Sequence, residues 1–115
     1  MRFLIIIKAS AESEAGQPPD AGLIAAMADF HATLARSGAL LDAADLAPSA
    51  EGWRLHLSKA EPVLERGPFD TPGELVAGYT LIQARSPDEA LEWARRFPTP
   101  RGAGHSTHIE LRPVR

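Results

Sequence analysis

A continuous apolar run near the start of the chain, Phe3-Leu4-Ile5-Ile6-Ile7, constrains the fold more than any other feature. Three adjacent β-branched isoleucines favour an extended backbone, and we predict a strand over residues 2–8. Because successive strand residues point to opposite faces, an unbroken apolar run needs a cover on both sides. Helices of the same chain can cover one side, and a second copy of the chain is the simplest cover for the other.

Two helices are predicted from spacing and from capping residues. Apolar residues three or four apart form one face between residues 20 and 38, with Asp20 as the N-cap. Ser86, Pro87 and Glu89 form a helix-start signal with a capping box, and Pro98 marks the end of this second helix. The other predicted segments are strands at 39–46, 53–58, 62–66, 78–84 and 107–114, loops at 9–19 and 99–106, and a single helical turn at 71–75.

This order of elements predicts an α+β fold of the ferredoxin-like type. In that βαββαβ plan, an antiparallel sheet carries two helices on one face, and here an extra hairpin is added. The 115 residues are expected to form a single domain, residues 1–115, and the 44% hydrophobic content is enough to build a core.

Composition excludes several classes of function. A formal net charge of −3 gives no basic surface for nucleic acid, so we expect no nucleic-acid partner. With no cysteine, the chain has neither disulfides nor thiol chemistry. The apolar run at residues 3–7 is too short for a membrane span or a signal peptide. We therefore expect a cytoplasmic protein with no membrane partner.

The segment Gly67-Pro68-Phe69-Asp70-Thr71-Pro72-Gly73 is the best candidate for a functional edge. Two glycines and two prolines within seven residues fix a backbone path that few other residues accept. Arg54, Arg66 and Lys8 are expected to bring positive charge to a cleft near Phe69. Such a cleft suits a small carboxylate or phenolate, with Phe69 and Tyr79 stacking on an aromatic ring. The alternatives are that Arg54 lies on a solvated strand face and Lys8 at a solvated strand end.

The histidines give little support for a metal site. His105 and His108 are the only two of the four that are close in sequence, and their spacing allows at most weak chelation. His31 and His56 have no histidine three or four residues away. We expect no metal and no cofactor.

The chain carries a set of segments in one order, at residues 1–9, 13–16, 39–41, Leu46, Pro48, 67–69, 74–79, 88–93 and 109–113. Taken together they make it resemble the YCII-related proteins, and within them the DGPF-domain branch. The resemblance covers nearly the whole chain, although Arg66 stands where the branch usually has Asp. It implies a homodimer of the dimeric α/β-barrel type, in which two sheets face each other.

The resemblance implies two classes of function. DGPF-branch relatives are often associated with alternative sigma factors, which favours a small-ligand-binding or regulatory homodimer with the Pro68–Phe69 turn as a lid. Other relatives are dehydrochlorinase-like enzymes with a His–Asp pair, and Met27 stands where their catalytic histidine is found. The alternative is therefore a small-molecule lyase or isomerase in which His31, one turn further along, works with Asp42 or Asp70. A packing role for His31 is the competing interpretation.

Overall fold

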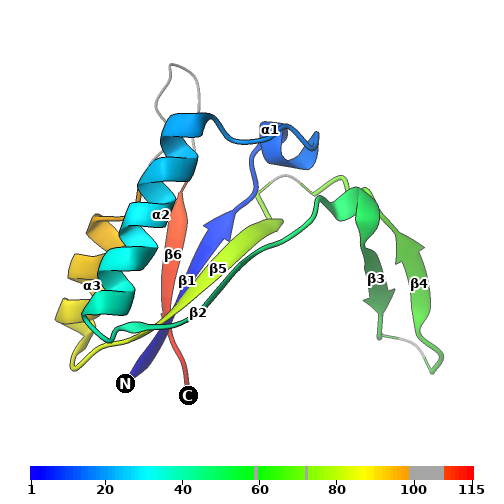
Figure 1. The fold of residues 1–115 in the computed structure, drawn as a ribbon. Coiled ribbons are helices and arrows are strands. Elements are labelled where there is room, and N and C mark those ends of the chain that lie inside the picture. The colour runs from blue at the N-terminus through cyan, green and yellow to red at the C-terminus, as the bar shows by residue number, and fades with distance from the viewer. Residues whose placement is uncertain (59, 72, 99–107) are drawn as a thin grey trace.

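The computed structural model describes residues 1–58, 60–71, 73–98 and 108–115. It is a mixed α+β structure with antiparallel strands, as the sequence predicts (Figure 1). The elements in chain order are β1 (Arg2–Lys8), α1 (Ala11–Glu14), α2 (Ala21–Arg36), β2 (Leu40–Asp45), the 3-10 turn η1 (Ser49–Glu51), β3 (Trp53–His56), β4 (Val63–Arg66), β5 (Val76–Gln83), α3 (Pro87–Arg95) and β6 (Ile109–Pro113).

Four strands form the main sheet in the order β2-β5-β1-β6. The two central strands, β1 and β5, pair antiparallel, and so do the flanking pairs β2–β5 and β1–β6. Helices α2 and α3 lie together on one face of this sheet (Figure 1). This arrangement is compatible with the ferredoxin-like plan. The hairpin β3–β4 is an addition to that plan, inserted in the chain between the strands β2 and β5 of the main sheet.

The core lies between this sheet and the two helices. Phe3 and Ile5 of β1, Ile82 of β5 and Leu34 of α2 are each at most 1% exposed. Phe30 of α2 packs edge-on against Phe97, with ring centroids 5.4 Å apart. The alternation along β1 therefore places Phe3 and Ile5 on the helix face, as expected for a strand that is covered on that side.

The opposite side of the sheet, here called the open face, is apolar at its centre. Leu4 and Ile6 of β1 lie beside Leu81 and Tyr79 of β5 in the strand register. All four are only half-buried, whereas Phe3 and Ile5 on the other side of β1 are buried. No element among the described residues lies over this face as α2 and α3 lie over the other (Figure 1).

The hairpin β3–β4 forms a separate two-stranded sheet that projects from the body (Figure 1). Its register pairs Leu55 with Leu64 and Arg54 with Glu65. Side-chain alternation thus gives the hairpin one face with Trp53, Leu55 and Leu64 and another face with the charged pair. The predicted link through Lys59 lies partly outside the described residues.

The structure corrects several element bounds. The predicted loop at 9–19 contains α1, which begins at a reciprocal pair of hydrogen bonds between Ser10 and Ser13. Residues 73 and 74 form a turn rather than the predicted helical turn, with Gly73 at a φ of 85°. Strand β5 begins at Val76, not at residue 78, because Val76 still pairs with Lys8. The predicted loop at 99–106, including His105, lies outside the described residues.

Both predicted helix starts are confirmed. The Asp20 carboxylate accepts the N–H of Leu23 at 2.7 Å, and the Ser86 hydroxyl accepts the N–H of Glu89 at 3.1 Å. The predicted capping box at α3 is not completed in return, because the Glu89 carboxylate instead accepts a hydrogen bond from Arg85 at 3.1 Å.

Candidate functional site

The Gly-Pro turn lies at the base of the hairpin and is anchored through its backbone. The Gly67 N–H donates to the Gly52 carbonyl at 3.0 Å, and the Phe69 N–H donates to the Ser49 hydroxyl at 3.1 Å. The peptide bond between Gly67 and Pro68 is cis. The turn is therefore fixed against η1, the segment that precedes β3.

A carboxylate from α1, near the start of the chain, completes this anchor. Glu14 of α1 accepts hydrogen bonds from both the N–H of Ser49, at 2.9 Å, and the Ser49 hydroxyl. Since the Ser49 hydroxyl also accepts the N–H of Phe69, one serine joins α1, η1 and the turn. Sequence reasoning missed this role of Glu14 and Ser49, because the two residues are 35 positions apart and no local pattern connects them.

Removing the Ser49 hydroxyl tests this anchor. We expect Ser49→Ala to lower the free energy of unfolding by about 1–2 kcal/mol, because a bond to the Glu14 carboxylate and the bond from the Phe69 N–H are both lost. Urea unfolding measures the change. Ser58→Ala is the matched control, since Ser58 is exposed and makes no side-chain hydrogen bond among the described residues. Equal stability of the two variants would contradict the anchoring role.

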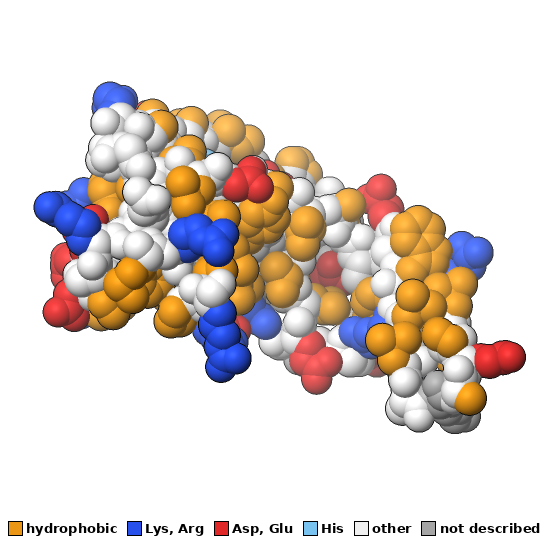
Figure 2. All heavy atoms as spheres, turned by 90° about the horizontal axis from the view of Figure 1, so that it is seen from below, with side chains coloured by type: hydrophobic (Ala, Val, Ile, Leu, Met, Phe, Trp, Pro, Cys, Tyr) orange, Lys and Arg blue, Asp and Glu red, His pale blue; other side chains and the backbone are white. Residues whose placement is uncertain are grey.

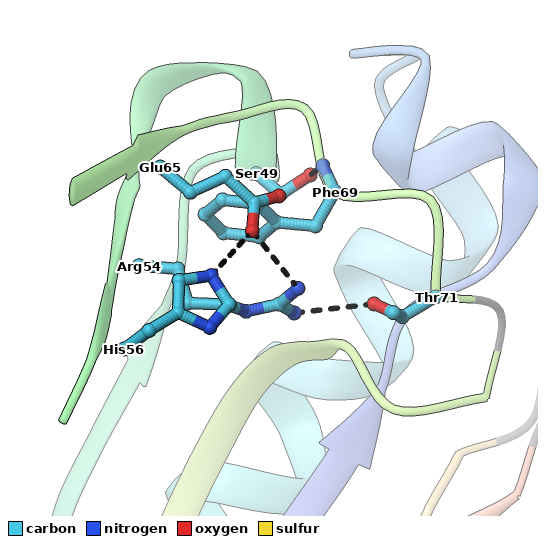
Figure 3. A network of polar contacts seen from close by, with 6 residues as sticks. All are labelled: Ser49, Arg54, His56, Glu65, Phe69 and Thr71. Carbon is cyan, nitrogen blue, oxygen red and sulfur yellow. Dashed lines mark hydrogen bonds and ion pairs between the residues drawn. The ribbon is translucent and has the colours of Figure 1, made fainter. Parts of the chain in front are cut away.

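Arg54 lies over the ring of Phe69 (Figure 3). Its guanidinium carbon is 4.2 Å from the ring centroid, and a guanidinium nitrogen donates to the Thr71 hydroxyl at 3.2 Å. Glu65, across the hairpin, is 3.9 Å from Arg54 and 2.8 Å from the ring nitrogen of His56. The cation–π contact and these polar partners hold the guanidinium and the aromatic ring in a fixed arrangement.

Phe69 also borders a cleft of about 440 Å³, here called the turn cleft. The predicted residues Pro68 and Asp70 share the lining with Phe69. Ser10, Glu14, Thr71 and Leu75 are also part of it, and the lining contains neither lysine nor arginine. The turn cleft therefore combines an aromatic ring, aliphatic surface, hydroxyl groups and carboxylates. Its volume suits a small ligand.

A larger hollow of about 610 Å³ lies elsewhere, beside α3 and the end of α2. It is lined in part by Ser37, Gln83, Arg85 and Trp93. None of the site residues predicted from the sequence borders it. The turn cleft is the better candidate because it adjoins the anchored turn and the ordered Arg54–Phe69 pair.

His31 lies in the layer between α2 and the sheet. Its ring nitrogen Nε2 is 3.1 Å from the hydroxyl of Thr80, which is fully buried, and its ring packs against Phe30 with centroids 5.8 Å apart. Met27, one turn earlier on α2, is half-buried. No carboxylate hydrogen-bonds His31 among the described residues, so the structure does not bring it together with Asp42 or Asp70.

Asp42 lies on the other side of the sheet from His31. It accepts a hydrogen bond from the Tyr79 hydroxyl at 2.9 Å, and Tyr79 adjoins Thr80 in β5 with its side chain on the opposite face. Lys8, also on the open face, is 3.6 Å from Glu110 and only 12% exposed. Tyr79 and Lys8 therefore belong to the open face and do not line the turn cleft.

Arg66 also lies away from Arg54. In the hairpin register Arg66 pairs with Trp53, and Arg54 pairs with Glu65. Neighbouring positions on a strand point to opposite faces, so the two arginines cannot act on one ligand from the same side of the hairpin. Arg66 has no ion pair or side-chain hydrogen bond among the described residues.

The contact between Tyr79 and Asp42 raises the pKa of the Tyr79 hydroxyl. The hydrogen bond to the carboxylate, the negative charge of Asp42 and a small loss of hydration all favour the protonated phenol. Because the pKa is higher in the folded state, the contact stabilises the fold below pH about 10 and this stabilisation is lost as pH rises through the folded pKa.

Tyr79 is the only tyrosine, so its titration can be read directly from the absorbance of tyrosinate. We expect the midpoint to lie above pH about 10 in the native protein and to fall toward it in Asp42→Asn. Asp45→Asn, on the same strand, is the control and should leave the midpoint unchanged. Identical midpoints in the wild type and in Asp42→Asn would show that the contact does not exist in solution.

Two further features bear on function. Among the described residues no group of three or more histidine and acidic side chains is placed to hold a metal ion. Of the suggested pair His105 and His108, His105 lies outside the described residues. No helix in the described part of the chain is long and apolar enough to cross a membrane.

The fold and the turn cleft define a small α+β protein with a ligand-sized hollow next to an anchored Gly-Pro turn. A family model, that of the YCII-related domain, matches residues 1–115. The chain belongs to the YCII-related family, as the resemblance in its sequence indicates. No curated protein matches it closely enough to add an activity.

Proposed function

We propose that this protein is a small-ligand-binding or regulatory homodimer of the DGPF branch, and that its ligand is a small aromatic molecule held in the turn cleft. The observation that carries the proposal is the position of Phe69. Its ring is held on one side by Arg54 at 4.2 Å and also borders a hollow of about 440 Å³. An aromatic ring fixed at the edge of a small hollow is a good surface for stacking a second ring.

The charges around the turn cleft favour an aromatic ligand over a simple carboxylate. Glu14 and Asp70 line it, and a carboxylate ligand would be repelled by both. Arg54 is already engaged by Phe69, Thr71 and Glu65. The hydroxyls of Ser10 and Thr71 suit a neutral polar substituent on the ring.

The homodimer is supported by the open face. Its centre, formed by Leu4, Ile6, Tyr79 and Leu81, is apolar and only half-buried. An antiparallel sheet with helices on one side usually has a polar second face, whereas the centre of this one is apolar and its charged residues lie toward the margins. We propose that two open faces meet in a dimeric α/β barrel. A cytoplasmic location remains part of the prediction from sequence.

The alternative, a lyase or isomerase that uses His31 with Asp42 or Asp70, has weaker support. It needs an acid within hydrogen-bond reach of the histidine. Among the described residues the polar partner of the His31 ring is Thr80, and Asp42 is engaged by Tyr79 on the opposite face of the sheet.

A thermal-shift comparison of three matched ligands tests the proposal. Benzyl alcohol, benzoate and benzylamine share one ring and differ in charge. We expect benzyl alcohol to stabilise the wild type, by about 2.7 kcal/mol at a hundred times its Kd, and Phe69→Ala to abolish the effect. Phe97→Leu, in the core, is the control and should lower the melting temperature without abolishing the shift.

Two results would count against the proposal. If benzoate stabilises the protein more than benzyl alcohol does, the ligand is a carboxylate and the argument from Glu14 and Asp70 is wrong. If none of the three ligands shifts the melting temperature, the turn cleft does not bind small aromatic molecules.

A further inference from the structure

The hairpin β3–β4 and the residue that follows β3 carry several strongly exposed apolar side chains. Trp53 is 63% exposed, Leu55 57% and Leu57 73%, and Leu64 is 52% exposed. Trp53, Leu55 and Leu64 share one face of the hairpin by strand alternation, and Leu57 follows directly after β3. Figure 2 shows hydrophobic side chains gathered on this projecting part of the molecule.

A hairpin of this kind needs a partner. An isolated two-stranded sheet is marginally stable in water, and this one projects from the body without an element packed on its apolar face among the described residues (Figure 1). At about 200 Å² per large side chain, the four exposed residues leave roughly 500 Å² of apolar surface in water. That area is near the upper end for a monomer, where such patches usually bind something.

We infer that the hairpin is an arm that lies on a second copy of this chain, against the edge of its open face formed by β2. This inference rests on the homodimer of the proposed function and goes beyond it. The surface it contacts consists of Asp42, Ala44 and Leu46, which alternate toward the open face and are all exposed. We call these three residues the β2 margin.

Charge complementarity supports this occupant. Arg66 lies on the apolar side of the hairpin beside Trp53 and has no ion pair among the described residues. Asp42 is the acidic residue of the β2 margin, and its carboxylate accepts hydrogen bonds from two uncharged groups, the Tyr79 hydroxyl and the Ala43 N–H. Each surface is thus apolar with one charge, and the two charges are opposite.

The area that a stable dimer needs also favours this arrangement. A standard interface buries about 800 Å² on each partner, and two hairpins packed only on each other would bury less. An arm laid on the partner's β2 margin adds its area to that of the open faces. In a twofold dimer each copy gives one arm and receives one, so the contact is made twice and the assembly closes.

Site-directed disulfide formation tests the arm, because the chain contains no cysteine of its own. One copy carries Leu55→Cys and an affinity tag, and the other carries Ala44→Cys; both positions are exposed, so both variants should fold. After mixing and mild oxidation we expect a mixed disulfide between the two copies. Leu55→Cys mixed with Leu91→Cys, on the exposed side of α3, is the control pair.

A mixed disulfide that forms with Ala44→Cys and not with Leu91→Cys supports the arm. Disulfides that join Leu55→Cys to itself, or to both partners equally, would overturn it. Light scattering on the same samples separates the two proposals. Dimers without the mixed disulfide leave the homodimer standing and remove the arm, whereas monomers remove both.

A charge exchange gives an independent check. Arg66→Glu and Asp42→Arg should each weaken dimerisation several-fold, and the double variant should restore it, because the two opposite charges then meet again. Failure of the double variant to recover dimerisation, with both single variants folded by circular dichroism, would contradict the contact between the hairpin and the β2 margin.

Discussion

Gly67→Ala is expected to lower the free energy of unfolding by about 3 kcal/mol or more, the largest effect of a glycine-to-alanine change among the described glycines. A Cβ at position 67 would lie 1.6 Å from the carbonyl oxygen of Ser49 and 2.6 Å from its carbonyl carbon. These are backbone atoms of η1, which is held by the Gly52 N–H and by Glu14, so they cannot move away cheaply.

Gly52→Ala is the matched control for this substitution. A Cβ there would be 3.5 Å from the same carbonyl oxygen, which is an ordinary contact. Urea unfolding of the two variants should therefore show a large loss for Gly67→Ala and a small one for Gly52→Ala. A Gly67→Ala protein within about 0.5 kcal/mol of the wild type would mean that the turn does not pack on η1 as described.

His31→Leu is expected to cost about 2 kcal/mol of unfolding free energy. The Thr80 hydroxyl is fully buried, and the ring of His31 is its partner among the described residues. Without the ring, that hydroxyl is left buried and unsatisfied, which costs about 1–3 kcal/mol. Adding Thr80→Val should recover most of the loss, because replacing both members of a buried pair by apolar groups is close to neutral.

The double-mutant cycle for this pair also separates a packing role from a catalytic one. A coupling energy of about 1 kcal/mol or more between His31 and Thr80 is expected for a structural contact. If the two substitutions are additive and His31→Leu costs nothing, the histidine is free of Thr80 in solution. The lyase alternative would then regain support.

Local signals made the helices and the first strand predictable. Asp20 and Ser86 cap helices through bonds to residues three positions away, so the pattern is visible in a short window. The apolar run of β1 is likewise local. Helix α1 was missed because it is only four residues long. Its N-cap is Ser10, but Ser13 stands at the third helical position, where a capping box usually has Glu or Gln.

The site was only partly predictable because its contacts depend on register. Arg54 lies over Phe69 but does not line the turn cleft, and Arg66 and Lys8 lie away from both. Glu65 lies opposite Arg54 in the hairpin register, and Arg66 is one position further along β4. A shift of one position moves a side chain to the opposite face of a strand, so Arg66 lies on the other face of the hairpin. The link between Glu14 and Ser49 spans 35 residues and leaves no local pattern to read.

The half-buried apolar centre of the open face is the feature on which the proposed homodimer and the proposed hairpin arm both depend. Leu4, Ile6, Tyr79 and Leu81 are too apolar a group to leave in water on one side of a sheet, so a second copy should cover them. Sedimentation equilibrium at micromolar concentration measures the assembly directly. The prediction is a species of twice the 12.3 kDa chain mass, and a stable monomer of 12.3 kDa would contradict it.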